Sequence, residues 1–135
     1  MVAELRQRHR DIALTALRIA VGLTYFSHGA GKLFGWFGAE GTVDLMTRFG
    51  AAGVIETVAG LGIVMGLFTR PLAFIASGEM AVAYFWIHWG GSNHMWWWQN
   101  RGEMVMVYSF VWLLFAAWGA GPYSLDAWLG GRARR

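Results

Sequence analysis

Four apolar segments, each near the length of a membrane crossing, alternate with shorter polar stretches along the chain. They cover residues 11–31, 51–68, 72–89 and 103–118. With a rise of 1.5 Å per residue, helices of this length only just cross a hydrocarbon core about 30 Å thick, so some are expected to extend further. The pattern predicts an all-α fold, an integral membrane four-helix bundle of antiparallel helices that forms one domain over residues 1–135.

The first apolar segment carries four polar or ionisable side chains: Arg18, Tyr25, His28 and Lys32. Their spacings of seven, three and four residues place them on one side of a helix. Because an ionisable face in lipid has to turn toward protein or water, this face marks a candidate functional region.

Composition supports the membrane interpretation. The chain is 56% hydrophobic and 14% charged, whereas soluble domains average about 45–50% and about 25%. The chain contains no cysteine, which excludes disulfides, thiol redox chemistry and cysteine-ligated metals. The tryptophans near one end of the predicted spans are expected to form an interfacial belt: Trp36, Trp86, Trp89 and Trp96 to Trp98.

The basic residues indicate topology rather than nucleic-acid binding. Six of the eleven lie in the two tails: Arg6, Arg8, Arg10, Arg132, Arg134 and Arg135. Arg70 falls on the same side of the predicted bundle, while Lys32, Arg48 and Arg101 fall on the other side. The positive-inside rule therefore predicts that both termini lie in the cytoplasm. The expected location of this multi-pass protein is a bacterial-type inner membrane.

Two ionisable residues are expected at matching depth near the cytoplasmic side. Arg18 and Glu79 each lie about 10 Å from the inner ends of their predicted spans. Their opposite charges predict an intramembrane ion pair, because a lone charge in lipid costs a few kcal/mol. The alternative is that Arg18 extends toward the inner interface while Glu79 is protonated and lies against a hydroxyl group.

A second polar group is expected in the outer half of the bundle and forms the candidate pocket: Tyr25, His28, Glu56, His88 and Glu103. Small residues around Glu56, such as Gly53 and Gly60, would let another helix or a flat ligand approach its carboxylate. The alternative is structural, in which His28 and Glu56 join two helices by a hydrogen bond.

Cofactor sites built from the chain alone are not predicted. His28 and His88 could be axial ligands of a b-type haem, but only one such pair exists and nothing marks a porphyrin slot. His88 and His94 are joined by a loop that fixes no metal-binding geometry, so no metal is predicted. The sequence also contains no phosphate loop, dinucleotide fingerprint or nucleophile elbow.

Three stretches together resemble the DoxX family of membrane proteins over nearly the whole chain. They are LRIAVGLTYFSHGAGKLFG, IETVAGLGIVMGLFTRPLA and NRGEMVMVYSFVWLLFAAWGAGPYSLDAWL. The positions that match the family's polar pattern are Arg18, His28, Lys32, Glu56, Arg70 and Glu103. The resemblance implies a four-helix membrane protein connected with quinone-linked oxidoreductase systems.

The functional hypothesis is therefore a membrane component of a quinone-linked redox system, with quinone as the expected ligand. Because the chain offers no electron carrier of its own, any reaction needs a bound cofactor or a partner, and whether the chain is itself an enzyme stays open. The expected partners are the lipid bilayer and either other membrane or redox subunits or further copies of this chain. Alternatives are a non-catalytic accessory subunit and a small oligomeric transporter.

Overall fold

The structure, a computed structural model, describes residues 1–132 and is helical without strands over that range, which confirms the all-α prediction. Arg134 and Arg135, counted above among the basic tail residues, lie outside the described residues. The elements, in chain order, are α1 (Val2–Phe34), α2 (Arg48–Met65), α3 (Thr69–Val82), the π-helix η1 (Ala83–Trp89), α4 (Gly90–Ser92), α5 (Trp97–Asn100), α6 (Glu103–Trp118) and α7 (Leu125–Arg132).

Four long helices form two packed pairs, α1 with α2 and α3 with α6, which meet where α2 contacts α3. Glycines allow α1 and α2 to approach closely. A Cβ atom on Gly29 would overlap the backbone of Thr57, and one on Gly60 would overlap the backbone of Phe26. This close backbone approach is the small-residue packing that is typical of helix pairs in membranes.

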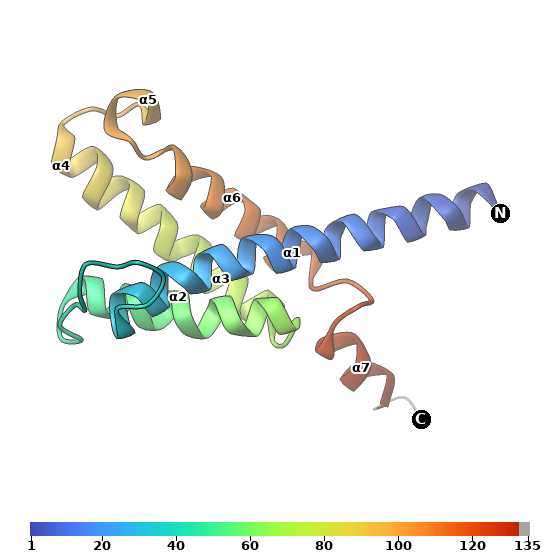
Figure 1. The fold of residues 1–135 in the computed structure, drawn as a ribbon. Helices are drawn as coiled ribbons and strands as arrows, with labels where there is room; N and C mark the ends of the chain where they lie inside the picture. The colour runs from blue at the N-terminus through green and yellow to red at the C-terminus, as the bar shows by residue number, and fades with distance from the viewer. Residues whose placement is uncertain (133–135) are drawn as a thin grey trace.

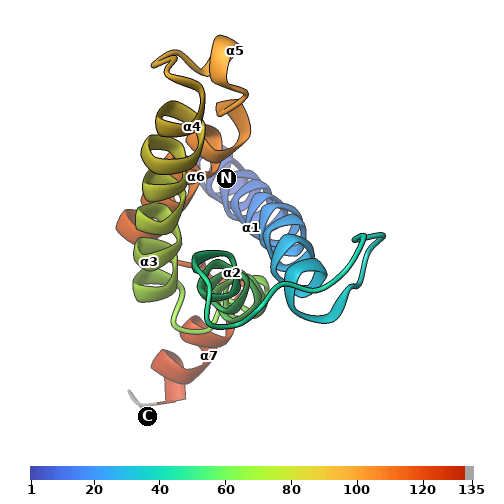
Figure 2. The ribbon, with the colours of Figure 1, turned by 90° about the vertical axis from the view of Figure 1, so that its left-hand side faces the viewer.

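The two pairs cross and then diverge (Figure 1). They separate toward the end that holds the last turn of α1, the first turn of α2, η1 and the start of α6, which we call the open end. Figure 2 looks at the bundle from this end and shows α1 and α3 on opposite sides of α2. At the opposite end, α7 lies beside the turn that joins α2 to α3, and we call this the closed end.

The core lies where the pairs cross and is built from both of them. Its fully buried aromatic residues are Trp112 and Phe115 of α6, with Tyr25 of α1 packed against Trp112 at 5.1 Å between ring centroids. Ile63 and the small residues Ala73 and Ala76 fill the space between α2, α3 and α6. The crossing point is therefore a closed apolar layer, and the polar groups lie beyond it toward each end.

Several helix boundaries differ from the predicted ones for local reasons. Residues 2–10, expected to be a polar tail, are the first turns of α1, since they contain good helix formers and Glu4 lies in the first turn. Helix α2 begins at Arg48, because the Thr47 hydroxyl accepts a hydrogen bond from the Gly50 amide at 3.1 Å and caps it. Helix α3 begins at Thr69, three residues before the predicted span.

Among the described residues, α2 is the single helix that satisfies a strict length and hydropathy criterion for a membrane span. The apolar helix α6 has 16 residues and is shorter than this criterion requires. Its bounds coincide with the predicted segment 103–118, while segment 72–89 is divided between α3 and η1.

Candidate functional site

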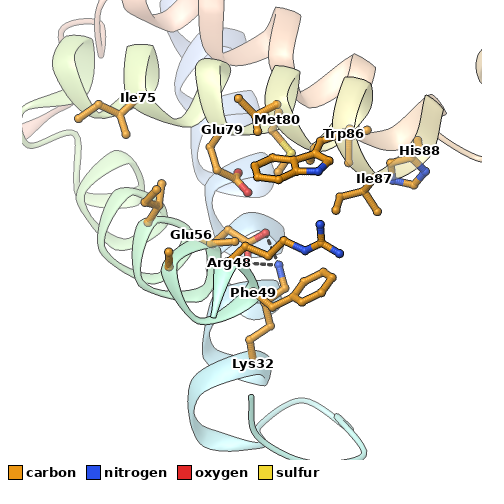
Figure 3. A pocket seen from close by; sticks show the side chains of 16 residues that line it. Lys32, Arg48, Phe49, Glu56, Ile75, Glu79, Met80, Trp86, Ile87 and His88 are labelled. Carbon is orange, nitrogen blue, oxygen red and sulfur yellow. Dashed lines mark hydrogen bonds and ion pairs between the residues drawn. The ribbon is translucent and has the colours of Figure 1, made fainter. Parts of the chain in front are cut away.

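A largely apolar cleft of about 440 Å³ opens between α2 and the α3–η1 helix at the open end. Its apolar walls include Phe49, Ile55, Ile75, Met80, Trp86 and Ile87. Five polar side chains also line it: Lys32, Arg48, Glu56, Glu79 and His88 (Figure 3). A mostly apolar cavity with a few convergent polar groups is the usual form of a small-molecule site.

An ion pair between α1 and α2 lies in the cleft. The Lys32 Nζ atom lies 2.7 Å from both carboxylate oxygens of Glu56. Glu56 is 3% exposed, while the Lys32 side chain is 30% exposed. Each partner packs against a glycine of the other helix, since Gly29 contacts the Glu56 Cβ and Gly53 contacts the Lys32 Cβ.

This ion pair leaves one hydrogen-bond donor unused. An ammonium group has three N–H donors, and Glu56 accepts two hydrogen bonds from Lys32. Because Lys32 lines the cleft and is partly exposed, its third N–H is available to a ligand there.

A second carboxylate, Glu79 of α3, lies across the cleft and points toward the ion pair (Figure 3). Its Oε2 atom accepts a hydrogen bond from the Tyr25 hydroxyl at 2.9 Å. Tyr25 is 1% exposed and packs against the rings of Tyr108 and Trp112, which fixes the direction of its hydroxyl. The cleft therefore holds two carboxylates around a single ammonium group.

The π-helix η1 continues α3 and extends the wall that faces α2, to which it contributes Trp86 and His88. π-Helices are rare and occur frequently at functional sites. The Nδ1 atom of His88 lies 3.0 Å from the Asn100 carbonyl oxygen. A carbonyl can only accept, so Nδ1 carries the proton and Nε2 is the acceptor in the neutral ring.

Arg48 connects the two walls at the mouth of the cleft. Its guanidinium carbon lies 5.2 Å from the ring centroid of Phe49 and 5.5 Å from that of Trp86. Both distances are within the range of cation–π attraction. The arginine side chain therefore spans from α2 to η1 and narrows the entrance.

The predicted ion pair between Arg18 and Glu79 is not formed in the described part of the chain, and the prediction was wrong. Arg18 donates instead to the carbonyl oxygens of Ile63, Val64 and Tyr123, at 2.6, 2.6 and 2.8 Å. Because α3 begins at Thr69, Glu79 lies about 15 Å along that helix rather than about 10 Å. It therefore meets Tyr25, seven residues beyond Arg18 on α1.

The residues of the predicted pocket fall in different places. Glu56 and His88 line the cleft, and Tyr25 contacts it through Glu79. His28 is exposed, with its ring edge against Tyr108 at 6.4 Å between centroids. Glu103 lines a separate cavity of about 790 Å³ between α1 and α6.

The structural alternative, a hydrogen bond between His28 and Glu56, is also not formed, since Lys32 binds both oxygens of Glu56. The sequence offered a signal for this, because Lys32 is on the same helical face one turn after His28 and has a longer side chain. Trp86 was expected only in an interfacial belt, and Arg48 only as a topology signal. Within residues 1–132, no group of three or more His, Cys, Asp or Glu side chains could hold a metal ion.

Comparison with known proteins places this chain among membrane proteins. The DoxX family profile matches residues 13–89, which contain the whole cleft except Val105. An uncharacterized protein of Haemophilus influenzae is 38% identical over 128 residues, covering 89% of this chain and 92% of the relative.

Two proteins of Escherichia coli K12 are also similar over most of their length. Inner membrane protein YphA is 34% identical over 134 residues, covering 87% of this chain and 90% of the relative. Inner membrane protein YqjF is 28% identical over 126 residues, covering 86% and 91%. No solved structure matches this chain significantly. The family profile and the near full-length relatives together show that this chain belongs to the DoxX family.

Proposed function

We propose that this protein is a multi-pass protein of the bacterial inner membrane, a four-helix bundle whose segments 11–31, 51–68, 72–89 and 103–118 cross the bilayer. Two relatives are named inner membrane proteins, which supports this location. The lipid bilayer would also cover the large apolar side chains that each pair leaves exposed, such as Leu23, Val58, Phe74 and Phe110. The arginine distribution supports cytoplasmic termini, with the open end facing outward.

Within this membrane protein, the cleft at the open end binds the head group of a quinone. The observation that carries this proposal is the unused N–H of Lys32 in an apolar cleft. A quinone has a flat apolar ring whose two oxygens only accept hydrogen bonds. Lys32 supplies a donor for such an oxygen, and the aromatic faces of Phe49 and Trp86 suit the ring.

The proposed role is that of a component in a quinone-linked redox system rather than a complete oxidoreductase. The chain has no cysteine with which to build an iron–sulfur cluster or a redox disulfide. Electrons would therefore come from a partner subunit or a bound cofactor, which makes other membrane or redox subunits the expected partners.

Binding measurements in lipid nanodiscs test the proposal. We expect ubiquinone and menaquinone analogues with short tails to bind the wild-type protein. A double variant, Lys32→Met with Glu56→Leu, removes the donor without leaving a buried unpaired charge or adding a new donor, and it should lower affinity about tenfold or more. Glu103→Gln, in the other cavity, is the matched control and should bind like the wild type.

Unchanged quinone affinity in the double variant would overturn the proposal, as would the absence of binding by the folded wild-type protein. Far-UV circular dichroism and size-exclusion chromatography of each variant establish that it is folded before its affinity is compared.

A further inference from the structure

Of the two carboxylates in the cleft, Glu79 is the one without a cation from residues 1–132 at ion-pair distance. Lys32 is committed to Glu56, and Glu79 has a single hydrogen bond, which it accepts from the neutral Tyr25 hydroxyl. Among the described residues, no cation lies within ion-pair distance of Glu79. An isolated ionised carboxylate in a medium of low polarity is costly, so this position favours either a proton or a ligand that donates.

The hydrogen-bonding roles of a carboxyl group change with its proton. Ionised Glu79 can only accept hydrogen bonds, whereas the protonated acid has one O–H to donate. The Tyr25 hydroxyl donates to Oε2, and the other oxygen, Oε1, has no hydrogen-bond partner from the described chain, while the side chain of Glu79 lines the cleft (Figure 3). What Glu79 can bind at this oxygen therefore depends on whether it holds a proton.

A quinone and its hydroquinone also differ in whether they can donate a hydrogen bond. The oxygens of the quinone accept hydrogen bonds, while the hydroxyl groups of the hydroquinone donate them as well. A quinone oxygen near Glu79 is therefore attracted by the protonated acid and repelled by the carboxylate. A hydroquinone hydroxyl can instead donate to the ionised carboxylate.

We propose that Glu79 is the group through which the cleft distinguishes quinone from hydroquinone, because it binds the quinone only when it carries a proton. This inference rests on the proposed function and assigns the regulation of that same site. It concerns binding alone and involves no electron transfer. The protonated acid holds the quinone together with the Lys32 ammonium, and the ionised acid favours the hydroquinone.

Other ionisable groups face this region from each element that packs around Glu79. They are Tyr25 and Lys32 from α1, Arg48 and Glu56 from α2, and His88 from η1. Helix α6 contributes apolar Val105 to the cleft, while its Glu103 lines the other cavity. The experiment must therefore separate the effect of His88 from that of Glu79.

The test compares ubiquinone-1 with its reduced quinol in nanodiscs between about pH 5 and pH 8. One linked proton makes the quinone affinity fall by up to about tenfold per pH unit as the pH rises through the titration of Glu79. The quinol affinity should stay level or rise over the same range. The variant Glu79→Gln keeps an acceptor for Tyr25 and a donor for the quinone, so its quinone affinity should not depend on pH.

Control variants assign the pH dependence to one residue. Glu103→Gln should retain the wild-type profile for both ligands. His88 lines the cleft, so His88→Gln can change the quinone affinity itself, but the dependence of that affinity on pH should persist, and Gln can donate to the Asn100 carbonyl in place of Nδ1. If the quinone affinity of Glu79→Gln still depends on pH while that of His88→Gln does not, the assignment to Glu79 is overturned.

A second measurement needs no variant. In weakly buffered solution above the titration of Glu79, quinone binding to the wild-type protein should take up about one proton, whereas quinol binding should take up none. Quinone binding without proton uptake at any pH would overturn this inference and leave the proposed function standing. Absence of binding by both ligands at every pH would overturn the proposed function itself.

Discussion

The two ends of the bundle hold ionisable side chains with different kinds of partner, backbone groups at the closed end and other side chains at the open end. At the closed end, Arg18 is 1% exposed and donates to three backbone carbonyls, two of them at the end of α2. Asp126 of α7 accepts hydrogen bonds from the Phe68 and Thr69 amides at the start of α3. At the open end, Lys32 and Glu79 are held by other side chains and keep hydrogen-bonding capacity that faces a cleft.

This difference distinguishes a charged side chain that stabilises the fold from one that is available to a ligand. Arg18 and Asp126 bind the groups that every helix leaves unpaired, the carbonyls of its last turn and the amides of its first turn. Their partners are therefore fixed by the fold. Lys32 and Glu79 bind no backbone group, so a ligand can use the capacity that they retain.

The largest effect is expected from removing the charge at the closed end. Arg18→Met removes a charged donor from three carbonyl oxygens and leaves two of them, those of Val64 and Tyr123, without a donor, which should destabilise the protein by roughly 3 kcal/mol or more. Thermal unfolding in detergent measures this loss. Arg70→Met is the control, because exposed Arg70 makes one long contact of 3.4 Å with the Trp118 carbonyl. Equal stability of the two variants would contradict the structural role of Arg18.

A smaller loss is expected from separating α1 and α2 beside the ion pair. Gly29→Ala places a methyl group against the Thr57 backbone and the Glu56 Cβ, which should cost about 1–3 kcal/mol. It should also weaken quinone binding, because Lys32 and Glu56 move apart. Gly78→Ala on α3 meets open space and should be as stable as the wild type. Unfolding curves and quinone affinities of the two variants decide between these outcomes.

The open end can also be probed chemically, because Lys32 is the only lysine of the chain. An amine-selective acylating reagent that reacts with the partly exposed Lys32 should be slowed about tenfold by quinone at ten times its dissociation constant. Mass spectrometry of the Lys32 peptide gives the rate, and acylation of the N-terminal amine is the internal control. Equal rates with and without quinone would show that the ligand does not cover Lys32.

The smallest effect is expected at the mouth of the cleft. Trp86→Leu removes the aromatic face on which Arg48 rests, an attraction worth about 0.5–1 kcal/mol. Quinone affinity should fall by about twofold to fivefold with little change in stability. Trp118→Leu, an exposed tryptophan at the closed end, should leave the affinity unchanged. Equal affinities in titrations of both variants would remove Trp86 from the site.

The apolar segments were sufficient to predict an all-α fold, because helical propensity and segment length are local properties. The depth of Glu79 was not predictable from them. It depends on where α3 begins, and Asp126, 57 residues away in the chain, caps that helix at Thr69. Because α3 begins three residues earlier than predicted, Glu79 contacts Tyr25 rather than Arg18.

The candidate site was predicted only in part for a related reason. The polar face of α1 was visible in the sequence, but the choice of Lys32 rather than His28 as the partner of Glu56 depends on how α1 and α2 pack at Gly29 and Gly53. Likewise, the sequence does not reveal that η1 is a π-helix, which sets the positions of Trp86 and His88. Glu103 was assigned to the pocket from its depth alone, and depth does not specify which side of α6 faces the cleft.

Photo-cross-linking with a quinone analogue that carries a reactive group on its ring tests most directly whether the open end is a quinone site. After illumination in nanodiscs, mass spectrometry should locate the label on the cleft residues of α2 and η1, such as Phe49, Met80 and Trp86. Excess unlabelled quinone should abolish this labelling. Labelling confined to the cavity between α1 and α6, or spread evenly over the lipid-facing side chains, would contradict the account.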